Sequence, residues 1–341
     1  MTAFSFGPET NDEMRRRLAG AADRFVDVRD RSDRDVALLA RELGIDIAVD
    51  LMGYTRNARS GIFDLRAAPI QVNFLGYPGT MGAAFIDYLI ADPTLIPPET
   101  RQHFTEAIAI AYLPESYQPN DDRRQISGRA FTRDELGLAH AKFVFCCFNN
   151  YYKITPATFD SWMRILREVD GSVLWLLEDN EVATRNLRQE ASRRQVSPDR
   201  LVFAPLMALA EHMARHRAAD LFLDTLPYNV HTTASDALWA GLPVLTCRGE
   251  TFAGRVAASL LAAARLPDLV TATLEEYESL AIALATSPQR LKRLGQQLAA
   301  SRHAVPLFDI TSFTRQIEAA YSAMQDRYLA DLSADVIRVE R

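Results

Sequence analysis

Short apolar segments alternate with helix-like segments along most of this 341-residue chain. The apolar segments are too short for helices and are typical of buried strands, whereas the segments between them carry apolar residues at helical spacing. Strands that alternate with helices form parallel sheets, because each helix returns the chain to the end of the sheet from which it started. The sequence therefore predicts an α/β fold. The expected strands are Arg24–Val28, Ile45–Leu51, Ile70–Phe74, Phe85–Ala91, Ile108–Leu113, Lys142–Phe148, Ser172–Leu177, Arg200–Phe203, Asp220–Leu223 and Leu242–Cys247, and the first expected helix is Asn11–Gly20.

Chain length and one polar stretch set the expected domain organisation. A chain of 341 residues is long for one domain and typical of two. The polar stretch Gln118–Arg129 is the best candidate for a linker. We therefore expect a first lobe over residues 1–130, a second lobe over 131–305, and a helical segment over 306–341 that packs back on the lobes.

Composition and charge argue against several classes of protein. The net charge is −6 and no Lys/Arg-rich run occurs, which disfavours nucleic acid as a partner. No apolar run approaches the roughly 18 residues that span a membrane, and the N-terminus lacks a signal-peptide pattern, so we expect a cytoplasmic protein without a membrane partner. The thiols of Cys146, Cys147 and Cys247 fall in predicted strands and lack zinc spacing, which predicts buried free thiols and no metal site.

The stretch from Asp224 to Leu261 is the most informative part of the chain. A helix is expected over Thr232–Ala240, directly after a predicted strand and its loop. Gly241 is well placed to end this helix in the left-handed conformation. Thr251 is expected to cap a further helix that starts at Phe252. The stretch thus places two helix starts near the carboxyl ends of strands.

The first of these helix starts suits an anion. The first turn of a helix has unpaired backbone N–H groups and the positive end of the helix dipole. Thr232 and Thr233 add hydroxyl donors, and His231 adds an imidazole. Asp236 lies one turn later on the face of Thr232, where its carboxylate can accept from sugar hydroxyls. The pattern predicts a nucleoside diphosphate site, with an ordinary capped helix and a satisfied histidine as the alternative.

A second candidate loop follows the strand Ile70–Phe74. Its sequence LGYPGTMG carries Gly76, Pro78, Gly79 and Gly82 within a few residues. Glycines allow a backbone to approach a ligand closely, and the carboxyl ends of parallel strands are where ligands bind. A purely structural turn is the alternative.

Four blocks of this sequence resemble the catalytic region of the O-linked N-acetylglucosamine (O-GlcNAc) transferase family. The resemblance implies the GT-B architecture, with two Rossmann-like lobes and a C-terminal helical return. It also implies transfer of N-acetylglucosamine from UDP-GlcNAc to serine or threonine hydroxyls of proteins, without a metal or other cofactor. The blocks are HTTASDALWAGLPVLT, GETFAGRVAASLL, DLMGYTRNARSGIFDLRAAPIQVNFLGYPGTMG and FNNYYKITPATFDSWMRIL.

The resemblance assigns roles to individual residues. Lys153, at the end of the motif NNYYK, is implied to bind the β-phosphate and to assist departure of UDP, although a solvated loop lysine is the alternative reading. His231 is the second expected catalytic residue. Leu209 stands where the family pattern has a nucleotide-contacting lysine. The implied donor-binding residues are Asn150, Met207, His212, Arg215, His231, Thr232, Thr233, Asp236, Gly76 and Pro78.

A departing diphosphate needs either a divalent cation or fixed positive groups. The one Asp-X-Asp motif, Asp33-Arg34-Asp35, opens a predicted helix, where its carboxylates complement the helix dipole. It is distant in sequence from the donor stretch. We therefore expect a metal-independent reaction in which Lys153 is the cation.

The family usually carries tetratricopeptide (TPR) repeats and an early strand–loop with an active-site histidine, and we find neither ahead of SFGPETNDEMRRRL. We therefore expect an incomplete first lobe, and a TPR-containing or N-terminal-lobe partner. Two alternatives to the main reading stay open. One is a UDP-hexose glycosyltransferase that acts on asparagine or a glycan, and the other is a non-catalytic module that binds UDP or a partner protein.

Overall fold

The structure is a computed structural model that describes residues 1–10, 12–104 and 109–340 of the chain. The chain divides into two compact α/β units. Unit 1 comprises Met1–Ala91, Glu99–Leu113 and Ile317–Glu340, and unit 2 comprises Asp92–Pro98 and Pro114–Gln316. No helix in the described ranges is long and apolar enough to cross a membrane.

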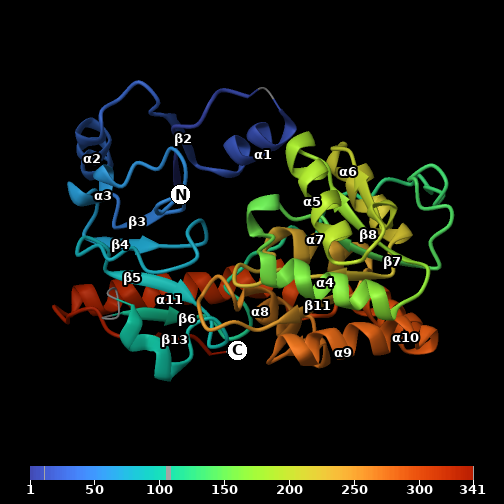
Figure 1. Cartoon of the computed structure of the whole chain (residues 1–341). Helices are drawn as coiled ribbons and strands as arrows, with labels where there is room; N and C mark the ends of the chain where they lie inside the picture. Colours follow the sequence, from blue (N-terminus) through green and yellow to red (C-terminus); the bar gives the residue numbers. More distant parts are fainter. Residues whose placement is uncertain (11, 105–108, 341) are drawn as a thin grey trace. The chain divides into compact units, whose positions relative to one another are not determined.

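Unit 1 is built on a five-stranded sheet in which every pair of neighbours is parallel, as the alternation of strands and helices predicts (Figure 1). The strand order is β13-β6-β5-β4-β3, and a separate parallel pair is formed by β1 and β2. The expected strand Ile108–Leu113 begins outside the described residues, as does the expected helix Asn11–Gly20. The strands are β1 (Thr2–Ser5), β2 (Arg24–Asp27), β3 (Ile47–Asp50), β4 (Ile70–Asn73), β5 (Tyr88–Ala91), β6 (Ile110–Tyr112) and β13 (Ile337–Arg338), and the helices are α1 (Glu13–Ala21), α2 (Asp33–Glu42), α3 (Gly61–Asp64) and the 3-10 helix η1 (Pro98–His103).

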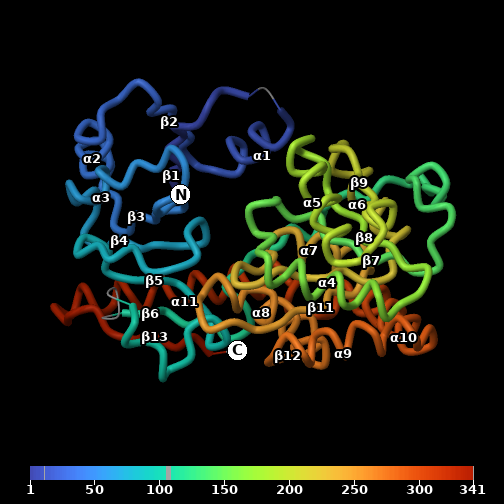
Figure 2. The backbone as a smooth tube through the Cα atoms, in the orientation of Figure 1, coloured from blue at the N-terminus to red at the C-terminus, as the bar shows by residue number. Residues whose placement is uncertain are grey.

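The C-terminal segment of the chain contributes a strand to unit 1. Within the segment that was expected to be helical, the long helix α11 spans Ile310–Leu329. Strand β13 follows it and pairs with β6, with Ile337 opposite Ala111. Figure 2 traces this return to the sheet. The strand was not expected, because a two-residue element has no periodicity that the sequence could reveal.

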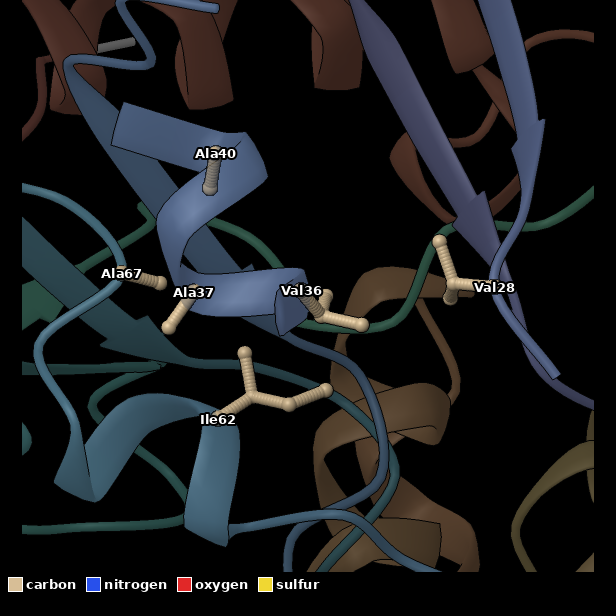
Figure 3. Close-up of a cluster of buried hydrophobic side chains, with 6 residues drawn as sticks. All are labelled: Val28, Val36, Ala37, Ala40, Ile62 and Ala67. Atoms are coloured by element: carbon tan, nitrogen blue, oxygen red, sulfur yellow. The ribbon is translucent and has the colours of Figure 1, made fainter. Parts of the chain in front are cut away.

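Helices α2 and α3 pack over the start of unit 1 through a small apolar cluster. Ser32 caps α2 by accepting from the Asp35 N–H, so the Asp-X-Asp motif occupies the first helical turn, as predicted. The helix presents three buried residues on one face. Figure 3 shows the six side chains of the cluster, which are Val28, Val36, Ala37, Ala40, Ile62 and Ala67.

Unit 2 is built on a six-stranded, fully parallel sheet in the order β12-β11-β10-β7-β8-β9. The chain starts in the middle at β7, winds outward to β9, then returns to β10 and winds outward the other way. This is the doubly wound order of dinucleotide-binding folds. The strands are β7 (Phe143–Cys147), β8 (Ser172–Leu177), β9 (Leu201–Ala204), β10 (Leu221–Leu223), β11 (Val244–Cys247) and β12 (Val270–Thr271).

The helices of unit 2 begin and end largely where capping residues predict. The Thr155 hydroxyl caps α4 with Pro156 in its first position, and Gly241 ends α7 with a φ of 90°. The three cysteines are buried free thiols, as predicted. The helices are α4 (Pro156–Glu168), α5 (Glu181–Arg193), α6 (Leu209–Arg215), α7 (Thr232–Ala240), α8 (Val256–Ala263), α9 (Leu274–Ala285) and α10 (Pro288–Ser301), with 3-10 turns η2 (Tyr151–Lys153), η3 (Pro198–Arg200), η4 (His216–Ala218), η5 (Pro267–Leu269) and η6 (Pro306–Phe308).

One predicted helix start was wrong. Helix α8 begins at Val256, four residues after the expected start at Phe252. The Thr251 hydroxyl accepts from the Gly254 N–H over 3.1 Å and so closes a tight turn instead of capping the helix. The turn packs closely on a neighbouring loop, since a Cβ added at Gly254 would lie 2.9 Å from the Pro227 carbonyl oxygen.

The stretch expected as a linker packs inside unit 2. Gln118 and Asn120 are each only 6% exposed. The Gln118 side chain donates to the Ser235 hydroxyl over 2.9 Å, and the Asn120 side chain donates to the Leu307 carbonyl over 3.1 Å. These polar side chains therefore satisfy buried groups of unit 2, which explains why a polar sequence here does not signal a flexible connection.

Candidate functional site

The candidate site lies where the winding of the unit 2 sheet reverses. Strands β7 and β10 pair with each other, but their crossover connections lead to opposite halves of the sheet. Loops that follow two such strands diverge, and open α/β sheets bind ligands at this point. The loop after β7 spans residues 148–155, and the loop after β10 spans residues 224–231. Both loops carry predicted site residues.

Lys153 connects the two loops through its ammonium group. The side chain is buried, and Nζ donates to the Asn229 carbonyl over 2.9 Å. Nζ also lies 3.9 Å from the centre of the Tyr228 ring, within reach of a cation–π contact. Burial lowers the pKa of Lys153 to about 8. Lys153 is therefore mainly a cation at neutral pH, and the carbonyl and the ring engage two of its three N–H groups, which leaves one donor for a ligand.

His231 precedes helix α7 and lies against the same tyrosine. The Tyr228 and His231 ring centres are 5.1 Å apart. Burial, together with the Lys153 charge, lowers the pKa of His231 to about 3, so the imidazole is neutral at neutral pH. Its Nε2 is buried and has no hydrogen-bond partner among the described residues. The Ala253 backbone already forms a hydrogen bond with this ring, so Nε2 is the ring nitrogen that a bound ligand can meet.

The first turn of α7 has free backbone donors beside these two side chains. His231 is the N-cap residue, yet its side chain makes no capping hydrogen bond. The His231 carbonyl accepts from the N–H groups of Ala234 and Ser235 over 3.0 and 3.3 Å. The preceding N–H groups, of Thr232 and Thr233, have no acceptor within the helix because of their position in the first turn. With the helix dipole, this arrangement favours a phosphate.

Asp236 lies further along α7 and forms an ion pair. Its Oδ1 accepts from the Arg124 guanidinium, and the two side chains are only 13% and 11% exposed. The Arg124 guanidinium also lies 5.3 Å from the centre of the Trp239 ring. Burial raises the pKa of Asp236, and the Arg124 charge opposes this shift. Because Oδ1 is paired with Arg124, only Oδ2 of Asp236 is left for the expected role of accepting from sugar hydroxyls.

His212 and Arg215 meet on the Phe148 ring, but they are not alike. The Arg215 guanidinium is fully buried, lies 4.5 Å from the Phe148 ring centre and donates to the Pro205 carbonyl over 2.6 Å. Its Nε and Nη2 have no partner within the described part of the chain. The His212 ring is half-buried and 5.3 Å from Phe148, and burial lowers its pKa to about 3. Met207, also half-buried, lies in the loop between β9 and α6.

Three further residues were predicted to bind the donor. Asn150 is exposed, and its carbonyl accepts from the Lys153 backbone N–H over 3.1 Å. Gly76 and Pro78 belong to unit 1. A Cβ added at Gly76 would lie 2.0 Å from the Leu51 carbonyl oxygen, so backbone packing alone requires a glycine there.

Sequence reasoning missed three residues that shape the site. Tyr228 and Asn229 hold the Lys153 ammonium, and Arg124 pairs with Asp236. Tyr228 and Asn229 lie in the loop after β10, so their position at the carboxyl edge of the sheet was a usable signal. Arg124 precedes its partner by 112 residues, and no motif indicated the pairing.

Comparison with known proteins gives the chain a family. The profile of glycosyl transferase family 41 matches residues 1–130 and 120–317. The probable UDP-N-acetylglucosamine–peptide N-acetylglucosaminyltransferase SEC of Arabidopsis thaliana is 36% identical over 327 residues, which cover 94% of this chain and 33% of that protein. A UDP-N-acetylglucosamine–peptide N-acetylglucosaminyltransferase of Caenorhabditis elegans is 28% identical, over 98% of this chain and 39% of that protein. The chain thus spans about a third of the length of these relatives.

Solved structures agree on the architecture. A mutant of the Thermobaculum terrenum O-GlcNAc transferase superposes with a TM-score of 0.87 at 34% identity, over 95% of this chain and 61% of that chain. The Anabaena protein HepE, in complex with UDP and glucose, shares the fold with a TM-score of 0.59 at 14% identity, over 94% of this chain and 91% of that chain. The predicted GT-B architecture is confirmed. The chain belongs to glycosyl transferase family 41.

Proposed function

We propose that this chain transfers N-acetylglucosamine from UDP-GlcNAc to serine or threonine hydroxyls of proteins. The names of the Arabidopsis and Caenorhabditis relatives describe this donor and a peptide acceptor, and the Thermobaculum protein is an O-GlcNAc transferase. The bond between the sugar C1 and the β-phosphate oxygen breaks, the acceptor hydroxyl oxygen forms the new bond to C1, and the hydroxyl proton passes to solvent or to a phosphate oxygen of the departing UDP. The bonding electron pair leaves with UDP, so the enzyme must stabilise a growing negative charge on the diphosphate.

The observation that carries the proposal is the cluster of positive groups at the reversal of the unit 2 sheet. The Lys153 ammonium, with a donor to spare, lies with the neutral His231 ring against Tyr228. The α7 start follows His231 directly and supplies the N–H groups of Thr232 and Thr233. These groups are fixed before a ligand binds, and fixed donors stabilise developing charge without reorganising during the reaction.

We further propose that the diphosphate is neutralised by these groups and not by a divalent metal. Lys153 supplies a full charge, and the α7 N-terminus supplies roughly half a charge through its dipole. Gly76, Pro78, Asn150, Met207, His212 and Arg215 stay predictions as donor-binding residues, as do a cytoplasmic location and a TPR-containing or N-terminal-lobe partner.

The test combines binding with turnover. UDP affinity is measured by isothermal titration in EDTA and again with manganese. Transfer is then followed by mass spectrometry of a protein acceptor incubated with UDP-GlcNAc, with UDP-glucose as the matched donor control. We expect UDP binding that EDTA does not weaken and addition of one or more N-acetylhexosamine groups. Binding that requires manganese would refute the metal-independent site. Faster transfer from UDP-glucose, or UDP binding without any transfer, would refute the proposed reaction.

A further inference from the structure

One peptide group lies between two charged side chains at the candidate site. The carbonyl of the Asn229–Val230 peptide accepts from Lys153 Nζ over 2.9 Å. The N–H of the same peptide donates to Asp224 Oδ1 over 2.7 Å. The peptide dipole therefore has its negative end on the ammonium and its positive end on the carboxylate. Hydrogen bonds in such a chain polarise and strengthen one another in a buried environment.

The Asp224 carboxylate is buried and saturated with donors. Asp224 is only 3% exposed and directly follows β10. Oδ1 accepts from the Thr225 N–H over 2.6 Å as well as from Val230, and Oδ2 accepts from the Thr246 hydroxyl over 2.6 Å. Burial raises the pKa of Asp224 to about 7, while these three donors and the Lys153 charge oppose the shift, so the carboxylate is ionised at pH 8.

Further hydrogen bonds hold the loop after β10 so that the Asn229 carbonyl faces Lys153. The Thr225 hydroxyl donates to the Tyr228 carbonyl over 2.7 Å, and the Asn229 side chain donates to the Thr225 carbonyl over 2.8 Å. The Asn149 side chain, from the loop after β7, donates to the Thr225 hydroxyl over 2.9 Å. Asp224 is thus one anchor of a loop that is fixed at both ends.

We propose that Asp224 is a positioning residue for the phosphate site, one that orients the Asn229–Val230 peptide toward Lys153 and keeps the buried lysine positively charged. This inference rests on the proposed function only for the identity of the reaction. Asp224 forms no ion pair with Lys153 among the described residues, and the Lys153 ammonium donates to the Asn229 carbonyl instead. Asp224 acts through the intervening peptide and through its charge, and so leaves the third N–H of the ammonium to the diphosphate.

The charges that face Lys153 give the sign of the effect. Burial lowers the pKa of Lys153 to about 8, whereas Asp224 and then Cys147 raise it. Lys153 and burial both keep His231 neutral, and burial raises the pKa of Cys147 to about 12, so neither of these groups titrates near pH 8. Removing the Asp224 charge therefore lowers the pKa of Lys153 further. The lysine then loses its proton at a lower pH, and the site loses its cation at the same point.

The substitution Asp224→Asn removes the charge and retains the shape. The new amide oxygen still accepts from the Thr225 and Val230 N–H groups, and the amide nitrogen donates to Thr246 once that hydroxyl rotates. Thr246→Val is the matched control, because it removes one hydrogen bond of Asp224 and leaves the charge. The readouts are UDP affinity and kcat/KM for UDP-GlcNAc, each measured at a series of pH values from about 5.5 to about 9.5.

We expect the alkaline limb of both readouts near pH 8 in the unsubstituted chain, where Lys153 loses its proton. In Asp224→Asn we expect this limb to move about one pH unit toward acid, so that activity at pH 9 falls about tenfold while the loss at pH 6 is much smaller. Thr246→Val keeps the limb in place. Adding Lys153→Arg to Asp224→Asn removes the limb, since a guanidinium stays charged. An equal loss at every pH, with the limb unmoved, would show a purely structural role and overturn the proposal.

A measurement on the unsubstituted chain covers the case in which Asp224→Asn does not fold. Carbon NMR of labelled lysine Cε and aspartate Cγ follows the ionisation of Lys153 and Asp224 directly. We expect the Asp224 carboxyl group to lose its proton at a lower pH than the Lys153 ammonium group does, and its signal to respond to the titration of Lys153. A protonated Asp224 at pH 8 would overturn the proposal. NMR and UDP titration need no acceptor, so they test Asp224 even if the chain transfers no sugar.

Discussion

Replacing Lys153 with methionine should slow sugar transfer far more than it weakens binding of the donor UDP-GlcNAc. Methionine retains most of the aliphatic stem, which matters because only 7% of this residue is exposed and a smaller side chain would leave a cavity. A unit charge about 4 Å from the ammonium, at an effective dielectric constant of about 20, is worth about 4 kcal/mol. The transition state carries only part of the charge that the leaving diphosphate gains. We therefore expect kcat to fall about 10²–10³-fold, which equals about 2.7–4 kcal/mol.

The assay is steady-state UDP release with saturating acceptor, paired with isothermal titration of UDP-GlcNAc in the absence of acceptor. Lys153→Arg is the control, because it retains the charge but not the compact ammonium. We expect the UDP-GlcNAc dissociation constant of Lys153→Met to change about tenfold or less, since the oxygen that joins the β-phosphate to the sugar gains its charge only as the bond breaks. Equal losses in kcat and in UDP-GlcNAc affinity would refute the reasoning and make Lys153 a simple ground-state contact.

The remaining predictions concern stability and can be measured by chemical denaturation. Asp236→Ala leaves Arg124 as a mostly buried cation without its carboxylate, and we expect the free energy of unfolding to fall by about 3 kcal/mol; a change below about 1 kcal/mol would show that the pair is well solvated. Gly76→Ala places a methyl group 2.0 Å from the Leu51 carbonyl oxygen, so we expect a loss of about 3 kcal/mol or more. Gly241→Ala is its control, with open space around the methyl group and only the strain of a φ of 90°, and it should cost about 1–2 kcal/mol. A larger loss for Gly241→Ala than for Gly76→Ala would contradict this ranking.

The parts of the fold that follow local rules could be predicted from the sequence. Helix α7 occupies Thr232–Ala240 as expected, since a run of helix-forming residues ends at a glycine that adopts the left-handed conformation. Strand β8 likewise matches its predicted bounds, Ser172–Leu177. The failures depend on distant contacts. β13 exists because it pairs with β6, more than 200 residues earlier, and the start of α8 is displaced by a turn that packs against Pro227.

The same distinction applies to the candidate site. Lys153 and His231 were predicted separately, and the structure brings both against Tyr228, a residue for which no role was predicted. Arg215 was expected only as a donor-binding residue, and the structure shows it fully buried, with its guanidinium donating to the Pro205 carbonyl and lying over Phe148. Burial and pairing of this kind depend on how the loops after β7, β9 and β10 fold together, which local sequence patterns do not encode.

A crystal structure of the chain with UDP, grown without divalent metal, tests the central claim most directly. The account predicts that diphosphate oxygens lie within hydrogen-bond distance of Lys153 Nζ and of the Thr232 and Thr233 N–H groups, with the Asn229 carbonyl still on the ammonium. A diphosphate bound away from Lys153 and the start of α7, or one that is ordered only when a divalent cation bridges it to carboxylates, would contradict the account.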